Sequence, residues 1–141
     1  MRILFVCTGN ICRSPFAAAL GPSIDPQHTY TSAGTNALVG EPASRPGIAA
    51  AHQHYEVGMG GHRATQLTAE MVENADIVYA MEQSHADEAS RLDPSARVEL
   101  LSPDGGPIPD PYGGDETAYL VSYSLIRRAL ALRLQPDLKS P

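Results

Sequence analysis

The sequence lacks several features that would point to common classes of protein. It has no tryptophan and only two cysteines among 141 residues, Cys7 and Cys12, which are too few for a disulfide scaffold. No stretch approaches the roughly 18 consecutive apolar residues that cross a bilayer, so we expect no membrane insertion. Positive charge is also scarce. Ten Lys and Arg against 16 Asp and Glu give a net charge of −6, which disfavours binding to nucleic acid or anionic membranes.

The length predicts a single domain over 1–141 with a hydrophobic core of its own. Met1 and Arg2 lead directly into an apolar run, which leaves no room for a signal peptide. Because both cysteines also lie in one short loop, we expect a reducing, cytoplasmic location. The residues from about 135 to 141 are expected to form a frayed tail.

The most informative stretch lies near the N-terminus. A β-branched apolar run at 2–6 is followed by a short loop and by a helix-forming segment at 14–21. A strand, a tight loop and a helix N-terminus together place an anion over free backbone N–H groups and the positive end of a helix dipole. Cys7 opens this loop and Arg13 closes it, with five residues between them.

The residue types in this loop favour chemistry at phosphorus. Such a loop can curl into a concave anion nest, and Gly9 and Asn10 suit the curl because both tolerate positive φ. The helix terminus and Arg13 favour a thiolate at Cys7, and Ser14 can donate a hydrogen bond to its sulfur. The planar guanidinium of Arg13 matches two phosphate oxygens. A thiolate beneath a bound phosphate is a nucleophile aimed at phosphorus.

Other interpretations of the loop are weaker. A lone cysteine is most often a small buried hydrophobe, and Cys-x5-Arg recurs by chance. The chain has neither a second cysteine pair nor a His-x-x-x-His pattern to complete a zinc site, so we expect no metal and no cofactor. The loop holds no lysine and one glycine, which excludes a nucleotide-binding loop of the Gly-x4-Gly-Lys-Ser/Thr type.

Strand and helix patterns alternate along the rest of the chain. Expected strands cover 2–6, 28–31, 76–81 and 97–101, and expected helices cover 14–21, 46–55, 68–74, a segment opening at 84, and 115–135. This alternation predicts an α/β fold, a single-domain doubly wound four-stranded parallel sheet with helices on both faces. The phosphate-binding loop after strand 1 and the loop after the fourth strand then share the carboxyl edge of the sheet.

Local signals set the expected ends of several helices. Gly21-Pro22 is expected to end the first helix, and Ser84-x-x-Asp87 resembles a capping box that opens the fourth. Thr68 and Asp115 are candidate N-caps. The last helix is expected to bury one apolar stripe, which consists of Ala118, Val121, Leu125, Ala129 and Leu132.

Hydrolysis of an aryl phosphate needs a second group besides the nucleophile. The departing phenolate must be protonated, so a general acid must lie within hydrogen-bond reach. Asp110 lies in a proline-rich loop, and Pro109 and Pro111 leave its backbone little conformational freedom. By itself an Asp-Pro pair usually marks a turn, and Asp104 and Asp115 are alternative acids.

The run VCTGNICRSP at 6–15 resembles the signature of the low-molecular-weight protein tyrosine phosphatases. The resemblance continues through SAGT at 32–35, GHRA at 61–64, DIVYAM at 76–81 and IPDPY at 108–112, and so covers nearly the whole chain. It implies a nucleophile at Cys7, a phosphate clamp at Arg13 and a general acid/base at Asp110. It also implies a loop that binds phosphate or other oxyanions and its supports, namely Thr8, Gly9, Asn10, Ile11, Cys12, Ser14 and Ser32.

The substrate pocket is expected to be flanked by Ile11, Leu38 and Tyr112. An apolar Ile11 favours an aromatic ring, whereas a threonine there would resemble the arginine-phosphate phosphatases of this fold. Many family members carry an aromatic residue shortly after the SAGT segment, but this chain has NALVG at 36–40. That departure resembles the bacterial phosphatases that act on autophosphorylated tyrosine kinases in capsule and exopolysaccharide export. The resemblance therefore implies a phosphotyrosine protein substrate, such a kinase among them.

The second cysteine and the histidines are less informative. In the family, a cysteine beside the nucleophile can trap its oxidised form as a reversible disulfide, which Cys12 could do, but packing within the loop explains Cys12 equally well. His62 matches a family position and is expected to be structural. His52, His54 and His85 fall on expected helices and are expected to face solvent.

Three other functions stay open. A thiol-coupled arsenate reductase of this fold passes oxidation to cysteines outside the loop, and this chain has none after Cys12, although a glutaredoxin-assisted version remains open. A protein-arginine phosphatase is a second alternative. The third is a non-catalytic phosphate-binding regulatory module.

Overall fold

The computed structural model describes residues 1–135. Within them, the four strands are β1 (Arg2–Cys7), β2 (Thr29–Gly34), β3 (Ile77–Ala80) and β4 (Val98–Leu100). The helices are α1 (Arg13–Ile24), α2 (Arg45–Tyr55), α3 (Ala69–Asn74), α4 (Gln83–Leu92) and α5 (Glu116–Leu134). The strands are parallel in the order β2-β1-β3-β4, which confirms the expected doubly wound sheet.

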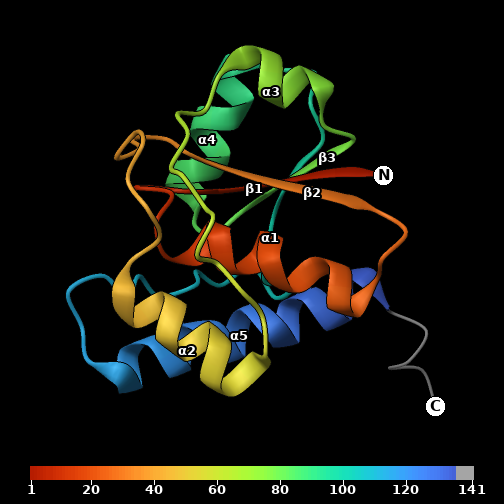
Figure 1. Ribbon diagram of the computed structural model, residues 1–141. Helices are drawn as coiled ribbons and strands as arrows, with labels where there is room; N and C mark the ends of the chain where they lie inside the picture. Colours follow the sequence, from red (N-terminus) through yellow and green to blue (C-terminus); the bar gives the residue numbers. More distant parts are fainter. Residues whose placement is uncertain (136–141) are drawn as a thin grey trace.

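Helices cover both faces of the sheet. In Figure 1, α1, α2 and α5 lie on one side of the strands, and α3 and α4 lie on the other. Successive side chains of a strand point to opposite faces. Thus Ile3 and Phe5 of β1 join the core against α1 and α5, whereas Leu4 and Val6 join the core against α3 and α4. Cys7 belongs with Ile3 and Phe5, so its side chain lies on the face that α1 covers.

Two predicted N-caps are confirmed. The Thr68 hydroxyl accepts a hydrogen bond from the Met71 N–H at 3.2 Å, and Asp115 Oδ1 accepts one from the Ala118 N–H at 3.0 Å. Each side chain thereby satisfies a backbone donor that has no partner within its helix. The tail that the sequence predicts at about 135–141 lies, from residue 136 on, outside the residues that the structure describes. Within 1–135, no helix has the length and hydrophobicity that a membrane crossing requires.

The prediction that α1 ends at Gly21-Pro22 was wrong. The helix continues through Pro22 to Ile24 and closes where the Asp25 N–H donates to the Gly21 carbonyl at 2.9 Å. Gly21 is needed for packing instead, because a Cβ there would lie 2.6 Å from the ring of Tyr30. The glycine therefore marks a close approach of helix and strand, not a helix end.

The predicted capping box at Ser84-x-x-Asp87 was also wrong. Helix α4 begins at Gln83 with Glu82 as its N-cap. His85 takes the role of the third helical residue, since its Nδ1 accepts a hydrogen bond from the Glu82 N–H at 3.1 Å. The helix therefore begins about two residues earlier than the Ser/Asp pattern indicated.

Helix α5 buries a different face from the predicted apolar stripe. Val121 and Leu125 are 47% and 37% exposed, and of the five expected positions only Ala129 is buried. The buried face is set by two tyrosines four residues apart, Tyr119 and Tyr123. The Tyr123 ring stacks on Phe16 of α1 at a centroid distance of 3.9 Å. Aromatic rings bury more area than alanine or valine, so they decide which face turns inward.

Candidate active site

The loop between β1 and α1 is held in place by hydrogen bonds that surrounding residues donate to its carbonyl groups. Every carbonyl from Cys7 to Cys12 accepts a hydrogen bond from surrounding protein. The donors, in order, are Thr35 N–H, Asn36 N–H, Leu38 N–H, His62 Nε2, Ser44 N–H and the Tyr123 hydroxyl, at 2.6–3.1 Å. Because the N–H of a trans peptide points away from its C=O, the N–H groups of 8–13 face the inner side of the curl. The loop therefore has the concave backbone form of an anion nest, and its binding of phosphate stays a prediction.

Asn10 supports the loop from within. Its backbone is left-handed, with φ 59°, and its side chain is fully buried. Asn10 Nδ2 donates to Ser14 Oγ at 2.8 Å and to Ser32 Oγ at 3.0 Å, while its Oδ1 accepts from the Thr65 N–H at 2.9 Å. Asn10 is therefore hydrogen-bonded to Ser14, to Ser32 and to the backbone of Thr65, and the role of these residues in supporting a phosphate-binding loop stays a prediction.

Gly34, and not Gly9, is the glycine on which the curl of the loop depends. Gly9 does not adopt positive φ, so Asn10 alone supplies the left-handed residue within the loop. Gly34, at the end of β2, is the position without room for a side chain, because a Cβ there would lie 2.4 Å from the Thr8 carbonyl oxygen. The close approach of β2 to the loop requires that glycine.

The Cys7 sulfur lies at the base of the nest. Its Sγ is 2.9 Å from Ser14 Oγ, and both residues are buried. Since the Ser14 hydroxyl accepts from the Asn10 amide, its hydrogen is free to point at the sulfur. A hydrogen bond of this kind stabilises a thiolate, as does the N-terminus of α1, which begins at Arg13.

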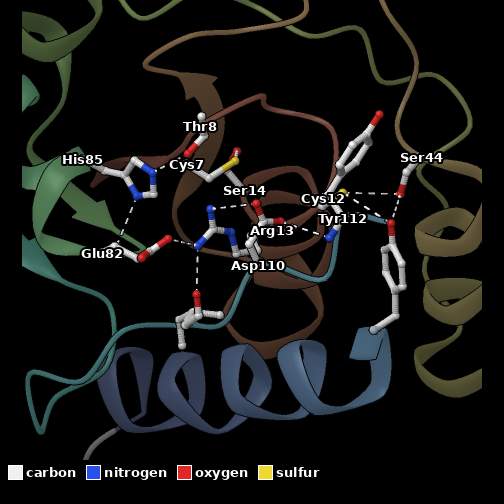
Figure 2. A network of polar contacts seen from close by, with 12 residues as sticks. Cys7, Thr8, Cys12, Arg13, Ser14, Ser44, Glu82, His85, Asp110 and Tyr112 are labelled. Carbon is white, nitrogen blue, oxygen red and sulfur yellow. Dashed lines mark hydrogen bonds and ion pairs between the residues drawn. The ribbon is translucent and has the colours of Figure 1, made fainter. Parts of the chain in front are cut away.

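Arg13 is almost wholly buried, with 2% of its side chain exposed. Its Nη1 donates to Glu82 Oε2 at 2.5 Å and to the Ile108 carbonyl at 2.8 Å, and its Nη2 lies 3.8 Å from Asp110 Oδ2 (Figure 2). The guanidinium therefore meets carboxylates from two different loops. Sequence reasoning missed Glu82, although its place just after a buried strand, at the carboxyl edge of the sheet, was a usable signal.

Asp110 lies at the rim of the same site. The Tyr112 N–H donates to its Oδ1 at 3.1 Å, which orients a carboxylate that is half exposed. The two alternative acids do not line the pocket. Asp104 caps a turn by accepting from the Gly106 N–H and the Ser102 hydroxyl, which lower its pKa, and Asp115 caps α5.

Apolar side chains surround the mouth of this pocket. Ile11 comes from the nest, Leu38 from the segment after β2, and Tyr112 from the loop before α5. Leu38 and Tyr112 are exposed at the rim, where three distant parts of the chain meet. The complete lining is Cys7, Thr8, Gly9, Asn10, Ile11, Cys12, Arg13, Asn36, Leu38, Asp110 and Tyr112, of which only Asn36 was not expected.

A family model for low molecular weight phosphotyrosine protein phosphatases matches residues 2–139. The chain belongs to this family. As a member it is an enzyme, a protein-tyrosine phosphatase. The phosphatase Etp of Escherichia coli (strain K12) is 37% identical over 131 residues, which cover 90% of this chain and 88% of Etp.

Solved structures of related phosphatases share the fold. Vibrio vulnificus Wzb in complex with benzylphosphonate has a TM-score of 0.91 and 31% identity, covering 96% of this phosphatase and 97% of that chain. A variant of the arginine phosphatase YwlE, a protein of Bacillus subtilis, carries a phosphorylated active-site serine. It has a TM-score of 0.88 and 30% identity, covering 99% of this phosphatase and 97% of that chain.

Cys12 is a buried thiol in this phosphatase. Its Sγ lies 3.5 Å from both Ser44 Oγ and the Tyr119 hydroxyl, on the side of the loop toward α2 and α5. Burial raises the pKa of Cys12, although hydrogen bonds to Ser44 and Tyr119 oppose the rise. Both cysteines are free. The disulfide between Cys7 and Cys12 stays a prediction.

The histidines divide into two groups. His52 and His54 are exposed, as predicted, and His62 supports the loop through the Asn10 carbonyl at 2.6 Å. The prediction that His85 faces solvent was wrong, since it is 2% exposed. Its Nε2 is 2.8 Å from Thr8 Oγ1, so the start of α4 turns this side chain toward the anion nest.

His85 should make the stability of this phosphatase depend on pH. Burial, followed by the nearby charge of Arg13, lowers the pKa of His85 from 6.5 to about 4. The unfolded chain therefore binds a proton at higher pH than the folded chain does. The stability that comes from keeping His85 neutral is complete above about pH 6.5 and is lost as the pH falls toward 4, by at most about 3 kcal/mol.

Urea unfolding of wild type and His85→Gln at pH 7 and pH 4.5 measures this contribution. The carboxylates titrate in both proteins, so only the difference in their pH dependence reports on His85. Wild type should lose more stability than the variant over this range. An equal loss in both proteins would show that His85 titrates at its ordinary pKa.

Proposed function

We propose that this phosphatase hydrolyses phosphotyrosine on proteins through a phosphocysteine intermediate at Cys7, with Arg13 as the phosphate clamp and Asp110 as general acid and then base. The observation that carries the proposal is the Cys7 sulfur beneath a nest of inward-facing N–H groups, with Arg13 and Asp110 beside it. The one domain that performs this reaction is proposed to span 1–141.

In the first step, the Cys7 thiolate attacks phosphorus in line with the leaving oxygen. An S–P bond forms as the P–O bond to the tyrosine breaks, and the departing oxygen takes the proton of Asp110. The loop N–H groups and Arg13 hold the equatorial oxygens, where negative charge is concentrated in the transition state.

In the second step, Asp110 acts as a base. Its carboxylate takes a proton from a water molecule as that water attacks phosphorus, and the S–P bond breaks to release phosphate. The Ser14 hydroxyl, 2.9 Å from the sulfur, stabilises the thiolate that leaves. The scheme uses only side chains and backbone of this chain, so chelators should not inhibit the enzyme.

The comparisons support this chemistry. A phosphorylated serine in the active site of a YwlE variant supports covalent phosphoryl transfer to the protein on this fold. Benzylphosphonate in the V. vulnificus Wzb complex joins an aromatic ring to a phosphonate, which supports an aryl phosphate as the substrate class.

The rim of the pocket supports a phosphotyrosine protein substrate. Ile11, Leu38 and Tyr112 offer apolar surface beside the nest, and Val39, which follows Leu38 in the chain, is strongly exposed. We propose an autophosphorylated bacterial tyrosine kinase as the partner, because the segment at 36–40 resembles phosphatases with such substrates. We propose that such a kinase is met in the cytoplasm, the location that the sequence predicts.

Comparing substrates tests the proposed activity. We expect kcat/KM to be highest for a phosphotyrosine peptide, lower for a phosphoarginine peptide, and negligible for arsenate with thiols. Ile11→Thr should lower kcat/KM for phosphotyrosine by roughly 10-fold, because apolar contact with the ring is lost. The change should spare phosphoarginine, which has no ring.

Each of the other results selects an alternative. Preference for phosphoarginine would favour the arginine phosphatase, for which the similarity to YwlE is the specific support. Thiol-dependent reduction of arsenate would favour the reductase. Phosphate binding without turnover of any of the three substrates would leave only the binding module.

A further inference from the structure

Hydrogen bonds behind the anion nest connect both ends of the loop to the turn that joins β3 to α4. Glu82 Oε2 accepts from Arg13 Nη1 at 2.5 Å, at the end of the loop. His85 Nε2 lies 2.8 Å from Thr8 Oγ1, at the start of the loop. The Glu82 N–H donates to His85 Nδ1 at 3.1 Å and closes the chain, as Figure 2 shows.

The direction of these hydrogen bonds follows from the neutral His85 ring. Nδ1 accepts from a backbone N–H, so the ring proton is on Nε2, which donates to the Thr8 hydroxyl. The charged groups that face His85 are Arg13 from α1, Glu82 from its own turn, and Asp110 from the loop after β4. A second proton on Nδ1 would point at the Glu82 N–H, so the arrangement holds only for the neutral ring.

Glu82 determines which edge of Arg13 is available. A guanidinium has five N–H donors in a rigid plane. Nη1 is engaged by Glu82 and by the Ile108 carbonyl. The edge formed by Nε and Nη2 is then left for a bidentate contact with two phosphate oxygens, and Nη2 is also the atom nearest Asp110.

We propose that Glu82 and His85 are positioning residues for the reaction proposed above: Glu82 holds the Nε and Nη2 edge of Arg13 toward the phosphate, and His85 holds the Glu82 turn against Thr8. The inference rests on the proposed function. The two residues stand three apart, one just before α4 and one in its first turn, so both side chains reach the same side of the turn.

Glu82→Gln is the main test, because it keeps the size of the side chain and removes its charge. The matched control is Glu88→Gln within α4, where the carboxylate contacts exposed Arg91 instead of the site. We expect Glu82→Gln to weaken binding of inorganic phosphate, measured by calorimetry, by about 10-fold. It should lower kcat/KM by about 10- to 100-fold, while Glu88→Gln matches wild type.

The sign of the change in phosphate affinity decides between positioning and competition. If Glu82 merely occupies Arg13 in the absence of substrate, then Glu82→Gln will bind phosphate more tightly than wild type. Tighter or unchanged binding would therefore overturn the inference. Phosphate binding does not depend on which ester is hydrolysed, so this readout still tests Glu82 if the proposed substrate is wrong.

A double-mutant cycle separates positioning of Arg13 from a general structural role. Lysine has no planar edge to orient, so in an Arg13→Lys background Glu82→Gln should change phosphate binding by less than 2-fold. An undiminished effect in that background would show that Glu82 acts through something other than Arg13.

His85 is tested by comparing two variants. His85→Gln retains an amide that can donate to Thr8, whereas His85→Leu has no donor. We expect kcat/KM at pH 7 to fall less than 3-fold in His85→Gln and about 10-fold in His85→Leu. A cooperative thermal transition in scanning calorimetry checks that both variants are folded. Equal losses would contradict the proposed contact with Thr8.

Discussion

Replacing Cys7 with serine is expected to lower kcat/KM for a phosphotyrosine peptide by about 10⁴-fold or more. A serine hydroxyl stays protonated at neutral pH, and the nearest side chain, Ser14 at 2.9 Å, is a hydroxyl that cannot serve as its base. The loss should appear in the chemical step, because the loop N–H groups that bind phosphate do not change. Steady-state kinetics together with phosphate calorimetry measures both quantities.

Cys12→Ser is the matched control for this variant. Cys12 lies in the same loop, but its sulfur contacts Ser44 and Tyr119. This variant should therefore retain far more turnover than Cys7→Ser. Comparable activity of Cys7→Ser and wild type would refute the phosphocysteine mechanism.

Replacing Asp110 with asparagine is expected to have the second largest effect. Loss of a general acid typically costs 10²–10⁴-fold, and we expect kcat/KM for phosphotyrosine to fall by roughly 10³-fold. The loss should be much smaller for 4-nitrophenyl phosphate, whose leaving group is stable as an anion and needs little protonation. Affinity for inorganic phosphate should stay within about 3-fold of wild type, because the carboxylate is not part of the nest.

Asp104→Asn is the control for the general acid. Asp104 lies in the same Pro- and Gly-rich loop, but it caps a turn through Ser102 and Gly106. Its replacement should leave kcat/KM unchanged for both substrates. A loss for Asp110→Asn that is equal for the two leaving groups would show that Asp110 does not protonate the departing oxygen.

The core of the site could be predicted because its signals are local. The apolar run before Cys7, the helix formers after Arg13 and the five residues between them determine a strand, a nest and a helix N-terminus. Asn10 was recognisable as a residue that tolerates a left-handed backbone, and its φ is 59°. The alternation of strand and helix patterns was sufficient to predict the order of elements, and with it the shared edge that brings Asp110 to the loop.

Predictions that depended on how helices pack were less accurate. The apolar stripe predicted for the last helix would bury Val121 and Leu125. In the structure both are exposed, because the rings of Tyr119 and Tyr123 take the buried face. Gly21 marked a close approach of α1 to Tyr30, where a local rule predicted a helix end. In both cases an aromatic side chain from the wider fold outweighed a local preference.

Local sequence patterns were thus sufficient to predict the fold class, the curled loop with Cys7 and Arg13 at its ends, and the loop that carries Asp110. The contacts of Glu82 with Arg13 and of His85 with Thr8 became apparent only in the folded chain. Their contacts join residues 69 and 77 positions apart, and no local pattern encodes which carboxylate or imidazole meets a given partner. Such pairings are set by strand order and by the angle at which α4 leaves β3, because the carboxyl ends of neighbouring parallel strands meet at one edge.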